Sequence, residues 1–149
     1  TSQASGAFRP RCSSGEIFPV MTEFPLRPVS SVGAPPAIGP YSQAVEAGGF
    51  LFLSGQIALN AQGEGPDGNA SSQAAQVLEN LDSVLRAAGV DRTRVVKTSL
   101  YLTDLEDFTA VNEVYEVFFG DHRPARVCVE VSALPKQARV EMDFIALAN

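Results

Sequence analysis

The chain has 149 residues, of which 45% are hydrophobic, enough for one buried core and hardly enough for two. Only 19% of the residues are charged, below the usual level of about 25%, so we expect a partner to cover part of the surface. The formal net charge of -6 disfavours general binding to nucleic acid, although an isolated basic pocket can still hold a small anion.

The cysteines and the single histidine exclude two further classes. Cys12 and Cys128 make neither a disulfide framework nor a CxxC pair, and with His122 alone a His/Cys metal cluster cannot be assembled. No apolar run in the sequence approaches the ~20 residues that cross a bilayer. These features predict a soluble, cytoplasmic domain that contacts no membrane.

The N-terminal segment differs from the rest of the chain. Residues 1–20 are rich in serine and arginine and poor in acids, which is typical of organelle transit segments. They also fit a disordered extension or an artificial remnant before a true start at Met21, and no amphipathic helix is visible there. Residues 21–36, rich in proline and serine, are expected to form an extended arm. We therefore expect residues 1–33 to be disordered or extended, and residues 34–149 to form the folded domain.

The first predicted elements are a hairpin and a helix. A Gly-Gly turn separates two strand-like runs, 42–47 and 50–57. A glycine-rich loop follows. Apolar residues then recur in steps of three and four, which predicts a helix over 70–88, with Asn69 as its N-cap and Gly89 as its C-terminal stop.

The second half alternates strands and a helix. β-branched residues predict a strand over 95–102, and an apolar stripe predicts a helix over 108–119. Two more strands, 126–132 and 139–146, are expected to form a second hairpin through a turn at 134–136. The order β-β-α-β-α-β-β predicts an α+β fold, with both helices on one face of a single sheet.

Alternation along the strands predicts one apolar face, packed against the helices, and one mixed face. The expected apolar set includes Leu51, Leu53, Ile57, Val127, Val129, Val131, Val140, Met142, Phe144 and Ala146. The expected mixed set includes Phe50, Phe52, Ser54, Gln56, Tyr101, Arg126, Cys128, Glu130, Ser132, Arg139, Glu141, Asp143 and Ile145. Antiparallel sheets often leave one face in water. The aromatic residues instead favour a subunit contact, and clefts between subunits are common ligand sites.

Arg126 is the first candidate for such a cleft. A buried arginine needs a carboxylate partner, and a guanidinium can bind a ligand carboxylate with two parallel hydrogen bonds. A salt bridge from Arg126 to Glu130 or Glu141 explains the same spacing equally well. The pattern alone leaves both interpretations open.

Four segments of the sequence, in this order, resemble the RidA/YjgF family of reactive-intermediate deaminases. They are 38–43 (IGPYSQ), 54–57 (SGQI), 124–131 (PARVCVEV) and 140–146 (VEMDFIA), with shorter matches at 96–98 and 112–115. The resemblance covers about residues 34–148. Each motif alone is weak, but four in order on independently predicted strands are specific.

The resemblance implies a chorismate-mutase-like α+β fold with a mixed sheet, and a homotrimer. Three sheets would close a central barrel and leave three clefts between subunits. It also implies hydrolysis of 2-iminobutanoate and 2-iminopropanoate, reactive enamine/imine products of pyridoxal-phosphate enzymes, to 2-oxo acids and ammonia. Such metabolite damage control requires no metal, nucleotide or redox cofactor.

The same resemblance assigns site residues. Arg126 matches the arginine that holds the substrate carboxylate, and Glu141 matches the acid that holds or activates water. Cys128 matches a pocket cysteine whose main-chain groups approach the imine nitrogen. Without a visible histidine partner, Cys128 need not act as a nucleophile.

The remaining substrate-binding candidates are Tyr41 and Ser54, which match pocket residues, and Gly55, which offers backbone close to the ligand. Each has a structural alternative. Tyr41 also suits the hairpin edge, and Ser54 beside Gly55 also suits a β-bulge.

Three further residues bear on the predicted pocket. Arg123 departs from the aromatic residue that often precedes Pro-Ala-Arg in the family, which bears on substrate preference. Asn112 is expected to anchor backbone near the second helix. Glu130 is expected to be structural.

Other functions compete with the deaminase. One is a non-catalytic binder of small carboxylates such as 2-oxo acids, which Arg126 and Glu141 together make less favoured. Another is a ribonuclease or translation inhibitor, which the acidic charge and the lack of a basic stripe or paired histidines disfavour. A chaperone-like role leaves no sequence pattern to test.

Overall fold

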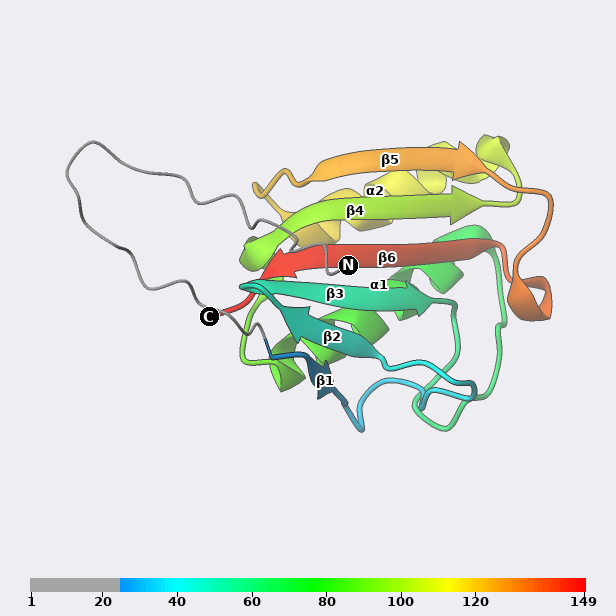
Figure 1. The fold of residues 1–149 in the computed structure, drawn as a ribbon. Coiled ribbons are helices and arrows are strands. Elements are labelled where there is room, and N and C mark those ends of the chain that lie inside the picture. Colours follow the sequence, from blue (N-terminus) through cyan, green and yellow to red (C-terminus); the bar gives the residue numbers. More distant parts are fainter. Residues whose placement is uncertain (1–24) are drawn as a thin grey trace, which may run out of the picture.

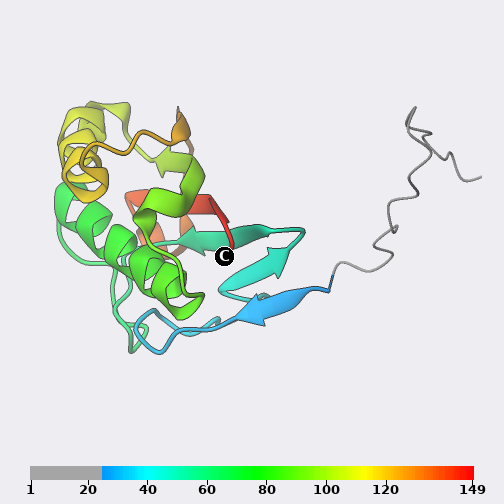
Figure 2. The same cartoon turned by 90° about the vertical axis from the view of Figure 1, so that its left-hand side faces the viewer.

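The computed structural model describes residues 25–149, in which six strands form one mixed sheet in the order β1-β2-β3-β6-β4-β5 (Figure 1). The elements in chain order are β1 (Arg27–Val29), β2 (Ala44–Ala47), β3 (Phe50–Gln56), α1 (Ala70–Ala87), β4 (Val95–Leu102), α2 (Phe108–Phe119), β5 (Ala125–Glu130) and β6 (Val140–Leu147). Both helices lie on one face of the sheet (Figure 2), which confirms the predicted α+β fold. The interpretations of residues 1–20, the start at Met21 and Cys12 lie outside the described residues.

Strand β1 is an element that the sequence pattern did not predict. It pairs antiparallel with β2, where Arg27 forms an ion pair with Glu46 at 2.8 Å. The buried side chain of Gln43 ties the following proline-rich segment to the sheet, because it accepts from the Ser31 amide at 2.6 Å and donates to the Pro35 carbonyl at 2.8 Å. Three residues are too few for alternation to reveal a strand.

The last strand, β6, lies in the middle of the sheet, antiparallel to both β3 and β4. β5 lies at the edge and runs parallel to β4, to which α2 connects it. The predicted hairpin between the last two strands is therefore wrong, because β4 separates them. Central placement buries the apolar face of β6 completely, with Val140, Met142 and Phe144 at most 1% exposed.

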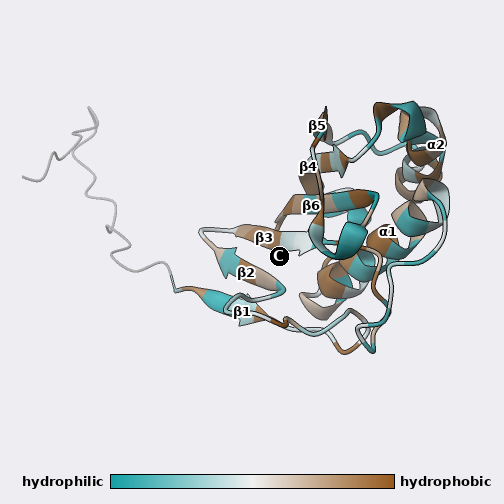
Figure 3. Cartoon of the chain, turned by 90° about the vertical axis from the view of Figure 1, so that its right-hand side faces the viewer, coloured by the Kyte–Doolittle hydropathy of each residue, from teal (hydrophilic) through white to brown (hydrophobic). Residues whose placement is uncertain are grey.

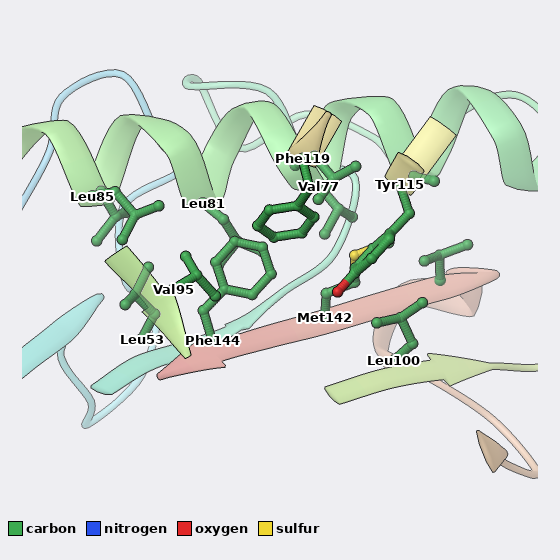
Figure 4. Packing of buried hydrophobic residues seen from close by; sticks show 14 of the residues in the cluster. Leu53, Val77, Leu81, Leu85, Val95, Leu100, Tyr115, Phe119, Met142 and Phe144 are labelled. Carbon is green, nitrogen blue, oxygen red and sulfur yellow. The ribbon is translucent and has the colours of Figure 1, made fainter. Parts of the chain in front are cut away.

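The core lies between the sheet and the helices. From α1, Val77, Leu81 and Leu85 pack toward Phe144 of β6 (Figure 4). Phe119 of α2 packs against the same ring in a tilted arrangement, with the two ring centroids 5.6 Å apart. Burying each such side chain contributes about 1.5–3 kcal/mol to folding, so the predicted apolar stripes of both helices account for their positions.

Helix α1 begins at the predicted residue, Ala70. Asn69 caps the helix through its side-chain oxygen, which accepts from the Ser72 amide at 2.9 Å. None of the helices in residues 25–149 has the length and apolar character that crossing a bilayer requires.

A β-bulge interrupts β3. Leu53 pairs with Phe144 and Gln56 with Met142, so two residues of β3 oppose a single residue of β6. This confirms the bulge interpretation of Ser54 and Gly55. It also corrects the predicted alternation, because the extra residue turns Gln56 onto the helix side, where it is buried.

The face assignment of β5 is also corrected. Its parallel register sets Arg126 beside Thr98 and Cys128 beside Leu100, and both of those β4 residues are buried under the helices. Arg126 and Cys128 therefore lie on the helix side, not on the mixed face. The alternation of polar and apolar residues along an edge strand does not reveal which of the two sets faces the helices. The rim of the helix that covers the edge can itself be polar, so polar strand residues can face it.

The opposite, open face carries the residues that β5 turns away from the helices. Val127 and Val129 of β5 are 42% and 40% exposed there, and Phe50 and Phe52 of β3, two strands away across β4 and β6, are 41% and 46% exposed. Figure 3 shows this side of the sheet without helical cover. Near the middle of the face, the Tyr101 hydroxyl donates to Asp143 at 3.1 Å. The predicted exposure of Phe50 and Phe52 on this face is confirmed.

Candidate functional site

Arg126 opens onto a cavity of about 400 Å³ at the edge of the sheet. Its lining residues come from α2, from the loop after it and from the start of β5: Asn112, Tyr115, Glu116, Arg123, Pro124 and Arg126. The loop between them is short, so it holds the C-terminal part of α2 close to the start of β5. We call this space the arginine cavity.

The guanidinium of Arg126 is held on the surface of α2. It donates to Oδ1 of Asn112 at 2.7 Å, and its central carbon lies 4.8 Å from the ring centroid of Tyr115 and 5.6 Å from that of Phe108. Such cation–π contacts attract arginine to aromatic faces. Among residues 25–149, Arg126 forms no ion pair with Glu130 or Glu141, so the intramolecular salt bridge left open by the sequence is not observed.

A hydrogen bond to β4 fixes the position of Tyr115. Its hydroxyl lies 2.9 Å from the Thr98 hydroxyl, and the two residues are 7% and 0% exposed. Figure 4 shows the ring with its oxygen directed toward the sheet. Burial raises the pKa of Tyr115, while the Thr98 hydrogen bond and the charges of Arg126 and Arg123 oppose that rise. The neutral ring therefore forms a rigid platform for the guanidinium.

Asn112 and Tyr115 are two cavity residues that the sequence interpretation does not place beside Arg126. Asn112 was expected to anchor backbone, but it binds the guanidinium of Arg126. Tyr115 belongs to the apolar stripe predicted for 108–119 and to the segment 112–115 that matches the family. The spacing of three residues, which places both on one face of α2, is the signal that points toward a shared role.

Glu141 lies at a second cavity, of about 250 Å³, which we call the glutamate cavity. Tyr41, Gly55 and Lys136 are among its lining residues. Glu141 is half-buried, and this burial, followed by the nearby charge of Asp143, raises the pKa of its carboxyl group. A raised pKa makes a carboxylate a stronger base, which suits a group that takes a proton from water.

Gly55 is required for this arrangement. A Cβ atom at Gly55 would overlap Oε1 of Glu141, so only glycine lets the carboxyl group lie over the β3 backbone at the bulge. The sequence predicts that Gly55 lets a ligand approach its backbone. In the structure it is the carboxyl group of Glu141 that lies close to this backbone. Across the same cavity, Lys136 has a left-handed backbone with φ of 55°, which marks a tight turn at the cavity wall.

The other predicted pocket residues take different positions. Tyr41 lines the glutamate cavity and is 51% exposed. The Ser54 hydroxyl donates to the Ser42 carbonyl at 2.6 Å and is not part of the wall of either cavity in residues 25–149. Cys128 is half-buried behind Arg126. Burial raises the pKa of its thiol, with Arg126 opposing, so Cys128 is not tuned to act as a nucleophile.

Arg126 and Glu141 lie on opposite faces of the sheet. Arg126 pairs with Thr98 on the helix side, whereas Glu141 pairs with Tyr101, whose side chain lies on the open face. The sheet itself separates the two groups. One small ligand therefore cannot contact both side chains within a single chain.

Known proteins resemble this chain over the segment that carries both cavities. Residues 32–148 match the family described as endoribonuclease L-PSP. A RutC family protein of Pyrococcus horikoshii is 50% identical over 114 residues, which are 76% of this chain and 90% of that protein. A human protein named 2-iminobutanoate/2-iminopropanoate deaminase is 42% identical over 128 residues, 85% of this chain and 93% of its own. The crystal structure of E. coli TdcF with bound serine superposes with a TM-score of 0.78 at 39% identity, covering 83% of this chain and 99% of that one.

Proposed function

Because the chain belongs to the RidA/YjgF/RutC family, the endoribonuclease L-PSP family of the match above, we propose that it is a 2-iminobutanoate/2-iminopropanoate deaminase. The observation that carries the proposal is the state of Arg126. Asn112 and two aromatic rings hold its guanidinium at a cavity, without an ion pair among the described residues. A charge held in this way suits a ligand carboxylate. The human relative's name and the serine bound to E. coli TdcF support an amino-acid-like substrate.

The proposed active site needs two subunits. Since Arg126 and Glu141 lie on opposite faces of one sheet, we propose a homotrimer in which the arginine cavity of one subunit faces the glutamate cavity of the next. The open face supports this assembly, because Phe50 and Phe52 on β3, and Val127 and Val129 on β5, leave exposed apolar side chains on both sides of it that a partner would cover. Three such sheets would close the barrel that the family resemblance implies.

The chemistry is a hydrolysis without electron transfer. Arg126 binds the substrate carboxylate and orients the imine carbon, and orientation of this kind lowers barriers by several kcal/mol. Glu141 accepts a proton from water while the water oxygen bonds to the carbon of the protonated imine, and the C=N π electrons pass to nitrogen. Glu141 returns that proton to the nitrogen of the resulting carbinolamine. The C–N bond then breaks as the hydroxyl proton passes back to Glu141 and C=O forms, and ammonia leaves with the 2-oxo acid and carries off that proton as ammonium. A positioned acid–base group typically contributes about 10²–10⁴-fold.

The other assigned residues complete the proposed pocket. Main-chain groups at Cys128 would approach the imine nitrogen, and Tyr41 with Gly55 would border the opposite wall. Ser54 would act through the bulge that it helps to form, because its hydroxyl is bonded to the Ser42 carbonyl. A ribonuclease activity is less favoured, since the chain is acidic with a net charge of -6.

A trapping assay tests the proposal. Threonine dehydratase generates 2-iminobutanoate in the presence of semicarbazide, and the deaminase competes with the trap. We expect the wild-type protein to suppress semicarbazone formation and Arg126→Ala to lose roughly 10–100-fold in kcat/KM, the cost of charged hydrogen bonds. Arg86→Ala, an exposed arginine on α1, is the control and should remain active. If folded wild-type protein leaves semicarbazone formation unchanged, the deaminase assignment is wrong, and binding of small carboxylates becomes the function to test.

A further inference from the structure

The arginine cavity contains a second guanidinium, that of Arg123. Its NH1 group donates to the main-chain carbonyl of Gly120, and also to that of His122 at 3.1 Å. These carbonyls belong to the turn that ends α2. A long, flexible side chain is thereby held at the cavity wall, three positions before Arg126.

The two guanidinium groups share the cavity with one aromatic residue, Tyr115. The positive charges of both Arg126 and Arg123 act on the Tyr115 hydroxyl. Arg126 is bound to neutral partners, Asn112 and aromatic rings. Arg123 is only loosely compensated, because Glu116 lies 3.6 Å from it and both side chains are 62% exposed. The lining thus holds two positive charges and one negative charge, in a chain whose net charge is -6.

A 2-imino acid with a neutral side chain can use only one of these cations. We infer that Arg123 is a specificity-determining residue, which makes the arginine cavity prefer 2-imino acids whose side chain carries a second anionic group, such as the imines of aspartate and glutamate. The inference rests on the proposed function for the site and for the role of Arg126. In this arrangement Arg126 binds the carboxylate next to the imine, and Arg123 binds the distal carboxylate in competition with Glu116.

The competition with Glu116 gives predictions of opposite sign. Arg123→Gln removes the second cation, so the ratio of kcat/KM for dicarboxylic over monocarboxylic imines should fall by about three- to fivefold, as expected for an exposed ion pair. Glu116→Gln removes the competing anion, so the same ratio should rise. Arg123→Lys keeps the charge without the planar fork and should retain part of the preference. Arg86→Gln is the matched control: Arg86 is 66% exposed and pairs with Asp82 at 3.2 Å on α1, and its loss should leave the ratio unchanged.

Two measurements keep this inference separate from the proposed function. Imines are generated in the assay by amino-acid oxidases acting on 2-aminobutanoate, aspartate or glutamate, and hydrolysis is followed by semicarbazide trapping. Calorimetry independently compares binding of 2-oxobutanoate with that of 2-oxoglutarate and oxaloacetate, which requires no catalysis.

If imines are hydrolysed but neither Arg123→Gln nor Glu116→Gln moves the ratio, the role of Arg123 is overturned while the deaminase stands. If no imine is hydrolysed, yet the dicarboxylates bind more tightly and Arg123→Gln alone removes that preference, charge selection by Arg123 is supported and the deaminase fails. Thermal melts confirm that each variant is folded.

Discussion

At the scale of single residues, the glutamate cavity depends on one half-buried carboxyl group, that of Glu141. Glu141 is half-buried above Gly55 and shares the open face with Asp143. Burial and the like charge both disfavour ionisation, and together they raise the pKa of Glu141. The folded protein therefore binds a proton at Glu141 more tightly than the unfolded chain does.

This shift predicts the pH dependence of both activity and stability. As a base, Glu141 must be ionised, so kcat/KM should rise with pH through its raised pKa, and Asp143→Asn should move that rise to lower pH. The stability contributed by Glu141 is present below its ordinary pKa and is lost as pH rises through the raised value. Glu141→Gln should therefore be inactive, yet melt at a higher temperature than wild type at neutral pH. Glu79→Gln, on the exposed side of α1, should change neither profile. A pH–rate profile that does not move in Asp143→Asn would contradict the assignment of Glu141 as the base.

At the scale of secondary-structure elements, α2 both covers the core and positions Arg126. The apolar side of the helix buries Val111 and Phe119, and the rim of that side presents Asn112 and Tyr115 to the guanidinium. The Tyr115–Thr98 hydrogen bond joins this rim to β4. The same helix thus links core packing to the position of a charge at the surface.

A double-mutant cycle tests this link. Tyr115→Phe leaves the fully buried Thr98 hydroxyl without its partner, which should cost about 1–3 kcal/mol of unfolding free energy. Thr98→Val in the same chain removes the orphaned group, so the double variant should recover most of that loss. Because the ring remains, kcat should change little and KM should rise modestly in Tyr115→Phe. Tyr115→Leu, which removes the ring itself, should raise KM much more. Equal effects on KM from Phe and Leu would show that the ring does not position Arg126.

The element scale also shows how far sequence patterns reach. Both helices were predicted to within a residue or two, because a stripe of apolar residues at a spacing of three and four has only one simple explanation. The strands themselves were also found, with boundaries differing by one or two residues, except for the three-residue β1. Their order was not predictable, since the position of β6 between β3 and β4 depends on contacts between distant segments.

Contacts between distant segments also limit how much of the site the sequence predicts. Tyr41 and Gly55 at the glutamate cavity, and Arg126 at the arginine cavity, were expected pocket residues. The predicted face of Arg126 was wrong. The register of β5 against β4 decides on which face Arg126 lies, and nothing within β5 reveals that register. Likewise, the bulge at Ser54 was anticipated, but its consequence for Gln56 was not drawn from the alternation.

At the scale of the whole molecule, the open face is the feature that one chain leaves unexplained. Phe52 of β3 is 46% exposed on this face and lies beside Ile145 of β6. An exposed apolar surface of this kind, next to charged residues on the same sheet, is expected to be covered by a partner in an assembly. The proposed homotrimer would cover it.

Charge at this face should break the assembly. Phe52→Glu would bury a carboxylate at the proposed barrel interface, so we expect sedimentation to show monomers and the trapping assay to show loss of activity. Val117→Glu is the matched control, because Val117 is 83% exposed on α2, away from the open face. It should leave both the assembly and the activity unchanged. A Phe52→Glu protein that stays trimeric would place the interface elsewhere.

The separation of Arg126 and Glu141 by the thickness of one sheet has a consequence for mixtures of defective chains. Arg126→Ala and Glu141→Gln should each be strongly impaired alone, yet each keeps the half of the site that the other lacks. If the two are unfolded, combined in equal amounts and refolded, random assembly should restore roughly a quarter of the wild-type active sites, since each site draws one half from each of two neighbouring chains. Two impaired proteins would then rescue one another in the same tube, as complementing alleles do in a cell.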